Sequence, residues 1–256
     1  MSLLNSQSLF TPQSYRQLRI TTGLIMWFYL GGHMLNHSLG LISLNLAERS
    51  MRTAVGLVHF WPITVLLYGA FLIHLLLALI GIWQRPSLRM QWSEVLRIAL
   101  GLGFPLLLIG HVFATRVSYE WFQLPSEYGR VVTGLISSGS EGRHLALLAP
   151  GWIHGCLGLD LSLRRRVLKV WRRLFWALAV ALPIFAAAGF LAMEREVTIL
   201  LNDPHWRETL SIKLAAEHGA FVKSRRELVV DVYLVTVVSV ILCRILILYR
   251  RQKPLT

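Results

Sequence analysis

Histidine is the residue type with which this sequence could do chemistry inside a membrane. Five of its nine histidines fall within long apolar segments: His33, His37, His74, His111 and His154. An ionisable side chain in hydrocarbon is costly and usually has a function. Imidazole is a metal ligand and a common axial ligand of haem iron. One buried histidine is explained by a hydrogen bond across a helix bundle, but four successive apolar segments that each contain one indicate a ligand site.

Six apolar segments must position these histidines, each near the roughly 20 residues that a membrane-crossing helix needs. The composition agrees, because 55% of the residues are hydrophobic and only 15% are charged. We predict an all-α integral membrane protein whose membrane domain covers residues 20–249, between an N-terminal segment 1–19 and a C-terminal segment 250–256. The predicted spans are about 20–46, 57–83, 97–117, 145–163, 174–193 and 228–249.

The net charge of +13 is distributed as membrane topology requires. The linkers on one side are rich in arginine and lysine with a single acid, Glu94, whereas those on the other side are nearly neutral. This positive-inside asymmetry predicts that both termini are cytoplasmic. The segment "RRRVLKVWRR" is then a topology anchor that contacts lipid headgroups, and no nucleic-acid partner is expected. The outer linkers, about 118–144 and 194–227, are long enough to form short amphipathic helices.

Depth in the membrane matches two of the histidines on the inner side. His74 lies 11 residues before Arg85, and His154 lies 10 residues before Arg164. At about 1.5 Å per residue, both histidines stand roughly 15–17 Å above the inner charges. In an up-down bundle the second and fourth helices are diagonal to one another, so these two side chains are a candidate pair.

Depth also matches a second pair further out. His33 lies 14 residues after Arg19, and His111 lies 14 residues after Arg97. Both then stand roughly 21 Å above the inner charges, on the other diagonal of the bundle.

His33 and His37 compete for one place in the outer pair. They are only about 6 Å apart on one helix face, so they cannot serve two sites at two depths. A count from the outer side, where the first span runs to Leu46 and the third meets charge at Arg116, favours His37 as the partner of His111. The count from the inner side favours His33, which we adopt.

Four segments of the chain resemble a known family of cytochromes. "TTGLIMWFYLGGHM", "GAFLIHLLLA", "LLLIGHVFA" and "WIHGCLGL" look like the histidine-bearing helices of the dihaem cytochrome b anchors of fumarate reductase and succinate dehydrogenase. The whole chain is similar to the six-span membrane anchor of bacterial class III adenylate cyclases, with "HxxxH" in the first span and "HGCLGL" in the fourth. One departure is Asp160, where an aromatic residue or another histidine is expected.

The resemblance implies cofactors and partners. It implies two haem b groups in the first four spans, the outer one bound axially by His33 and His111 and the inner one by His74 and His154. It also implies a bacterial inner membrane, a homodimer, membrane quinone or quinol as the redox partner, and a cytoplasmic cyclase-type effector in cis or in trans. His37 and Arg116 are candidate contacts for a quinone or a haem propionate.

Three functional readings follow. The first is a dihaem b redox-sensing anchor that regulates an adenylate cyclase domain absent from this chain; no catalytic residue is expected here, and the last span would transmit the signal. The second is a cytochrome b electron-transfer subunit of a quinone oxidoreductase. The third is a haem-free transporter or metal protein, which the lack of an HExxH motif and of acids deep in the first four spans disfavours. The outer-linker histidines His144, His205 and His218 are given no role.

Overall fold

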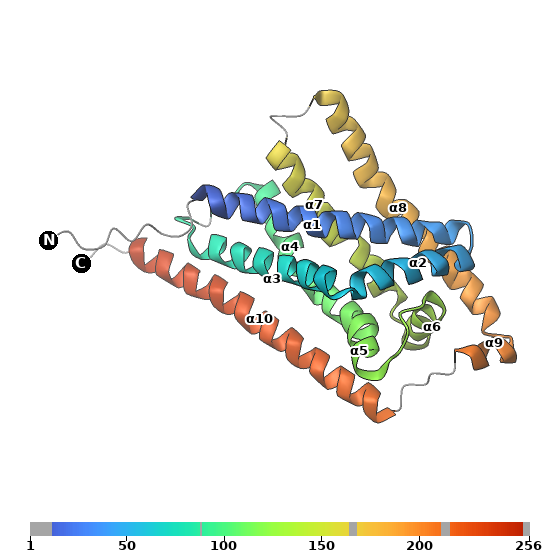
Figure 1. The fold of residues 1–256 in the computed structure, drawn as a ribbon. Coiled ribbons are helices and arrows are strands. Elements are labelled where there is room, and N and C mark those ends of the chain that lie inside the picture. The colour runs from blue at the N-terminus through green and yellow to red at the C-terminus, as the bar shows by residue number, and fades with distance from the viewer. Residues whose placement is uncertain (1–11, 88, 164–167, 211–215, 253–256) are drawn as a thin grey trace.

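The structure is a computed structural model that describes residues 12–87, 89–163, 168–210 and 216–252, and all the regular elements within these ranges are helical (Figure 1). The long elements are α1 (Pro12–Ser38), α2 (Leu44–His59), α3 (Trp61–Trp83), α4 (Trp92–Val112), α7 (Glu141–Leu163), α8 (Lys169–Leu200) and α10 (Ala216–Gln252). The short ones are η1 (Leu39–Leu41), η2 (Phe113–Val117), α5 (Ser118–Phe122), α6 (Tyr128–Ser138) and α9 (Pro204–Thr209).

The prediction of an all-helical chain with several helices apolar enough to cross a membrane is confirmed for the described residues. Five described helices are long and apolar enough to cross a membrane: Trp61–Trp83, Trp92–Phe122, Glu141–Ser162, Lys169–Leu200 and Gly219–Arg250. Helix α1 is also long enough, with 27 residues, but polar side chains such as His33, Asn36 and His37 lower its mean hydropathy. A sixth span at α1 therefore stays a prediction.

The first predicted span, 20–46, is not one helix. Helix α1 ends at Ser38, and a 3-10 turn follows at η1. Ser43 then caps α2, because its side-chain oxygen accepts a hydrogen bond from the backbone nitrogen of Leu46 at 3.2 Å. Helix α2 was not predicted as a separate element. It ends at His59, and α3 begins at Trp61 with a proline in its first turn, where the missing N–H costs nothing.

The remaining predicted elements differ mainly at their ends. The third span continues from α4 through the π-helical turn η2 into α5. The outer linkers contain the short helices predicted there, α6 and α9. Arg164, from which the depth of His154 is counted, lies outside the described residues, as do residues 1–11 and 253–256 of the predicted terminal segments.

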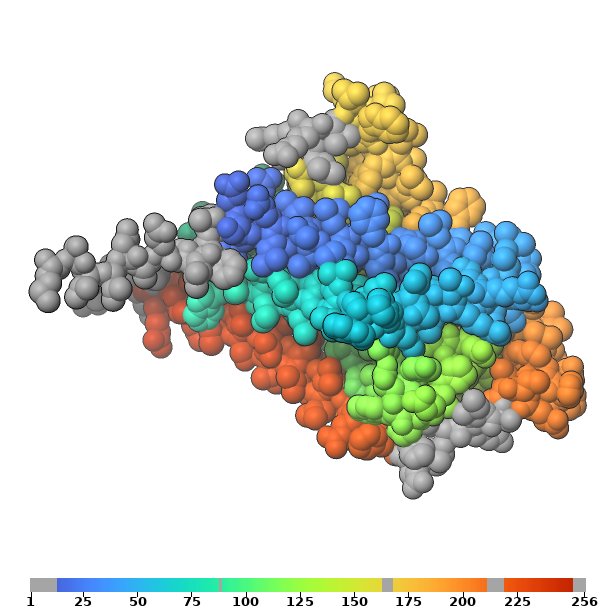
Figure 2. All heavy atoms as spheres, in the orientation of Figure 1, coloured from blue at the N-terminus to red at the C-terminus, as the bar shows by residue number. Residues whose placement is uncertain are grey.

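Helix α1 packs against α3, α7 and α8, while α4 packs against α7. Helix α10 contacts α3 and α4 and runs along the flank of the molecule (Figure 1). Atoms of α1, α2 and α3 form much of the face seen in Figure 2. The buried apolar residues form two clusters. One joins α2, α6 and α8 through Leu44, Ala47, Met51, Tyr128, Val132, Phe190, Met193 and Val197; the other joins α1, α7 and α8 through Met34, Leu148, Trp152, Cys156, Ala179, Leu182 and Ala186.

Two glycines allow α8 to approach the end of α1. A Cβ atom added to Gly189 would overlap the carbonyl oxygen of His37, and one added to Gly40 would overlap the carbonyl oxygen of Gly189. The backbones therefore touch at this point, as small residues permit in membrane helices. This contact fixes the end of α1 that holds His33 and His37.

We expect Gly189→Ala to force α1 and α8 apart and to destabilise the protein by about 1–3 kcal/mol, the usual cost of overpacking. Thermal unfolding in detergent would measure the effect. Gly134→Ala is the matched control, since a Cβ there meets no atom within 4 Å. Equal melting temperatures for Gly189→Ala and the wild type would contradict the close contact.

Candidate functional site

His74 on α3 and His154 on α7 face one another at the level predicted to be the inner one. Their ring centroids are 6.1 Å apart and the ring planes meet at 86°. The Nδ1 atom of His154 lies 2.8 Å from the carbonyl oxygen of Arg97, which can only accept, so Nδ1 carries the proton. The Nε2 atom of His154 is then left with a free lone pair, as a metal ligand requires.

His74 is oriented in the same way from α1. Its Nδ1 lies 3.1 Å from the hydroxyl oxygen of Thr22, and that hydroxyl lies 2.8 Å from the carbonyl oxygen of Leu18. Because the hydroxyl has one proton and gives it to Leu18, its oxygen accepts from Nδ1–H of His74. Both histidines of this inner pair thus use Nδ1 as an anchor and keep Nε2 for a ligand.

Glycines make room for the inner pair. A Cβ atom on Gly101 of α4 would lie 2.5 Å from Cε1 of His154, and a Cβ on Gly23 of α1 would lie 3.3 Å from Cε1 of His74. The imidazoles therefore lie almost against the backbones of neighbouring helices. Any side chain at 101 would displace the ring of His154.

Arginines adjoin the inner pair. Arg97 supplies the carbonyl that holds His154, and its own Nε is buried without a hydrogen-bond partner among the described residues. Its guanidinium lies 3.9 Å from Glu94, and its charge acts on that of Arg19. Arg19 and Arg97 together have more positive charge than the neighbouring Glu94 can balance, so this place favours a bound anion. A haem propionate would be such an anion.

Four histidines gather in the outer half: His33, His37, His111 and His144. The ring centroids are 5.8 Å apart for His33 and His111, 5.8 Å for His37 and His144, and 5.4 Å for His111 and His144. His33 and His37 are closer still, with 3.2 Å between their Nε2 atoms. The two histidines that the depth count matched on this side therefore lie together, with two more beside them.

His144 is the residue that sequence reasoning missed, because it was assigned to a linker. It lies in the first turn of α7, 9% exposed, with its ring centroid 4.8 Å from that of Phe190. The signal for it was present: His144, Leu148, Trp152 and Cys156 recur every fourth residue and are all buried, as one face of a helix would be.

A polar network fixes His37 from the outer side. Asn36 donates from Nδ2 to the hydroxyl of Tyr128 at 2.8 Å, and that hydroxyl lies 3.3 Å from Nδ1 of His37. If Tyr128 donates its proton to Nδ1, the proton of His37 is on Nε2 and points to Nε2 of His33. Nε2 of His33 then accepts this hydrogen bond with its lone pair, so a metal that binds His33 must displace the contact with His37.

Glu48 secures the residue that orients His37. Its Oε2 accepts from the backbone N–H of Tyr128 at 2.8 Å, at the N-terminus of α6, where a carboxylate is favourable. Burial raises the pKa of Glu48. Helices α2 and α6 are thus joined over the outer histidines.

The other candidate residues have separate partners. Arg116 pairs with Glu120 at 2.7 Å and donates to the carbonyl oxygen of Val58 at 3.4 Å. Asp160, the departure from the family pattern, accepts two hydrogen bonds from Arg172 at 2.5 and 2.8 Å and so joins α7 to α8.

The backbone N–H of His205 donates to Asp203 on the exposed helix α9. The side chain of His218 lies outside the described part of the chain.

The imidazole pairs fit axial ligation of haem iron. Two metal–nitrogen bonds of about 2 Å, with about 1 Å from each nitrogen to its ring centre, place the centroids about 6 Å apart. The observed separations are 6.1 Å for His74 and His154 and 5.8 Å for His33 and His111, and the same 5.8 Å separates His37 from His144. Among the described residues, no group of three or more histidine, cysteine or acidic side chains is arranged to hold a metal ion.

We expect two haem groups to respond separately to ligand substitutions. His74→Ala and His154→Ala should remove the same haem or leave it high-spin, because each opens one axial position. His111→Ala and His33→Ala should affect the other haem, whereas His37→Ala should retain it. Reduced-minus-oxidised spectra with haem quantification would show this. Loss of one common haem in His74→Ala and His111→Ala would contradict the pairing.

Gly101→Ala should disturb the inner haem alone, since the new Cβ displaces His154 from the Arg97 carbonyl. Gly103→Ala on the same helix is the control, because its Cβ meets no atom within 4 Å. Redox titration would measure both potentials in each variant. Unchanged potentials and haem content in Gly101→Ala would contradict the proposed anchoring of His154.

The main feature of the site is two imidazole pairs, His74 with His154 and His33 with His111, at two levels of the helix bundle. Comparison with models of protein families, with curated proteins and with solved structures finds no match to this chain.

Proposed function

We propose that this chain is a dihaem b membrane anchor that senses redox state and regulates a cytoplasmic effector. In this proposal six helices cross a bacterial inner membrane with both termini in the cytoplasm, and the four histidine-bearing helices α1, α3, α4 and α7 form an up-down bundle. His74 with His154 and His33 with His111 are the axial ligands. The observation that supports the proposal most directly is the pair of ring separations, 6.1 and 5.8 Å.

Haem b with two axial imidazoles supplies reversible one-electron transfer. Around it, the residues of this chain orient ligands and balance charge. Thr22 and the Arg97 carbonyl hold Nδ1–H of the inner pair, which fixes the rings and makes Nε2 more basic. Arg19 and Arg97 would bind propionates, and nearby cations favour the reduced state because it has one positive charge fewer.

Membrane quinone is the proposed redox partner on the outer side. His37, held by Tyr128, and Arg116, in the turn after α4, are the candidate groups for its oxygens. A quinol must lose protons when it gives up electrons, and His37 could accept one at Nδ1 if the quinol displaces the hydrogen bond from Tyr128. Quinol-driven reduction that proceeds unchanged in both His37→Ala and Arg116→Ala would remove this part of the proposal.

The contacts of α10 favour a sensor over a simple electron-transfer subunit. Arg244, 7% exposed, donates from Nε to the carbonyl oxygen of Arg85 at 2.9 Å, at the end of α3. The side chain of Arg85 pairs with Glu94, and Glu94 lies 3.9 Å from Arg97, whose carbonyl holds His154.

This series of contacts leads from an inner ligand to the helix that ends near the cytoplasmic effector. Tyr233 adds a second bond, from its hydroxyl to the Leu102 carbonyl of α4 at 2.6 Å. A change of charge at Nε2 of His154 alters the strength of the hydrogen bond at Nδ1. If α10 can pack in two arrangements, this small change could shift the balance between them.

A fusion protein tests the sensor function. A cyclase domain joined after Thr256 should show different activity with the quinone pool oxidised and reduced, and the difference should vanish in His154→Ala. Class III cyclase sites form between two domains, so paired anchors are expected. Equal cyclase activity with the quinone pool oxidised and reduced, when the haem is shown to change its oxidation state, favours the alternative. That alternative is a cytochrome b electron-transfer subunit of a quinone oxidoreductase.

We expect Arg244→Gln to uncouple α10 from the inner site without loss of haem. Cys243 is exposed and Cys156 is buried, so a thiol-reactive spin label should attach next to Arg244. The label's spectrum should differ between the oxidised and reduced states of the wild-type protein. The control Arg250→Gln, which alters an exposed arginine on the same helix, should show the same redox-dependent difference. The difference should disappear in Arg244→Gln. A redox-dependent difference that survives in Arg244→Gln would contradict this route.

A further inference from the structure

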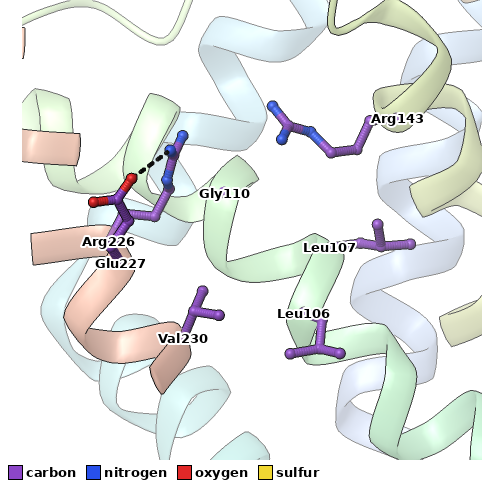
Figure 3. A pocket seen from close by; sticks show the side chains of 7 residues that line it. All are labelled: Leu106, Leu107, Gly110, Arg143, Arg226, Glu227 and Val230. Carbon is purple, nitrogen blue, oxygen red and sulfur yellow. Dashed lines mark ion pairs between the residues drawn. The ribbon is translucent and has the colours of Figure 1, made fainter. Parts of the chain in front are cut away.

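A cavity of about 210 Å³ lies between α4, α7 and α10, and two of its lining residues, Gly110 and Arg143, directly precede His111 and His144 (Figure 3). Its walls are Leu106, Leu107 and Gly110 of α4, Arg143 of α7, and Arg226 and Val230 of α10. On α10 it adjoins the N-terminal half of the helix, around Arg226 and Val230.

The polar end of the cavity has more positive than negative charge. Arg143 reaches toward the cavity from one side and Arg226 lies on the other (Figure 3). Glu227 is the one acid of the lining, and it is shared, with 4.0 Å to Arg226 and 4.0 Å to Lys223. The Nη2 atom of Arg143 donates to the hydroxyl of Ser140 at 3.1 Å, and among the described residues no other hydrogen bond of this side chain is seen, so most of its five donors can bind another group.

The other end of the cavity is apolar. Leu106, Leu107 and Val230 line it, and Leu106 is 38% exposed. A Cβ atom on Gly110 would meet nothing within 4 Å, so no side chain of the described residues occupies this space. Both α4 and α10 belong to helices apolar enough to cross a membrane, and in a membrane the surface beside the cavity would be next to lipid.

We propose that this cavity binds an anionic phospholipid, with the phosphate between Arg143 and Arg226 and the start of an acyl chain along Leu106 and Val230. Guanidinium groups bind phosphate oxygens through paired hydrogen bonds, and basic pockets between membrane helices suit lipid head groups. A molecule with an anionic head and an apolar tail matches both ends of the cavity.

The lipid would complete the packing of α10. Arg244 and Tyr233 bind α10 to α3 and α4 at one end and the middle. Around Arg226 and Val230 the cavity separates α10 from α4 and α7, and beyond it Phe221 contacts Trp121 of α5. A phosphate held by Arg143 of α7 and Arg226 of α10 would join the two helices there. This role is independent of haem, so binding can be measured whatever the haem content.

Native mass spectrometry of the detergent-purified chain would test the proposal with dioleoyl phosphatidylglycerol, with dioleoyl phosphatidylcholine and with inorganic phosphate. We expect one tightly retained phosphatidylglycerol per chain. Arg143→Gln and Arg226→Gln should each weaken binding by about fivefold, from the roughly 1 kcal/mol per arginine of such contacts. Gly110→Leu should abolish binding by filling the space.

Matched controls are available on α10 and on α6. Arg225→Gln removes a neighbouring arginine that stacks on Phe221 at 5.0 Å, and Gly134→Leu adds the same side chain to open space elsewhere. Both should bind like the wild type, and absorption spectra would verify that each variant is folded as before. Retention of phosphatidylglycerol that is unchanged in Gly110→Leu and in the double variant Arg143→Gln with Arg226→Gln would overturn the proposed site. Equal retention of phosphatidylcholine by the wild type would also overturn it. Binding of phosphate alone with the same affinity would show a small-anion site instead.

Discussion

Buried imidazoles in hydrocarbon impose the constraint on which the rest of this structure depends. Each ring must have a partner at both nitrogens, because an unpaired polar group in a low dielectric is costly. The inner pair meets half of this need with Thr22 and the Arg97 carbonyl. The other half, at Nε2, is where a metal would bind. Gly101 and Gly23 follow from the same constraint, because only glycine lets the rings lie against neighbouring backbones.

The two levels of the site differ in how the surrounding helices support them. The inner pair adjoins arginines and is connected through Glu94 and Arg85 to α10. The outer cluster lies under α2 and α6, which Glu48 and Tyr128 join, and beside the close contact of α1 with α8. The function proposed above assigns electron and proton exchange to the outer level and the output to α10 to the inner level.

The sequence was informative where charge anchors a helix in the membrane. Distances from basic residues matched His74 with His154 and His33 with His111, and the rings of each pair lie together. Tertiary contacts could not be predicted in this way. Helix α1 ends at Ser38 because of the Ser43 cap and the Gly40–Gly189 approach, and an apolar run shows neither. His144 was missed because the predicted span began at 145, four residues after α7 begins at Glu141, although the four-residue spacing from His144 to Leu148 could be read from the sequence.

The central claim is that the paired imidazoles bind two haem b groups. The most direct test is the chain purified from membranes of haem-sufficient cells, with haem counted per chain as the pyridine haemochrome and near-infrared magnetic circular dichroism recorded on the oxidised protein. The account predicts two haem b per chain, both with the charge-transfer band of low-spin bis-imidazole iron. A protein that folds and unfolds cooperatively but shows no Soret band, even after haem supplementation, would contradict it.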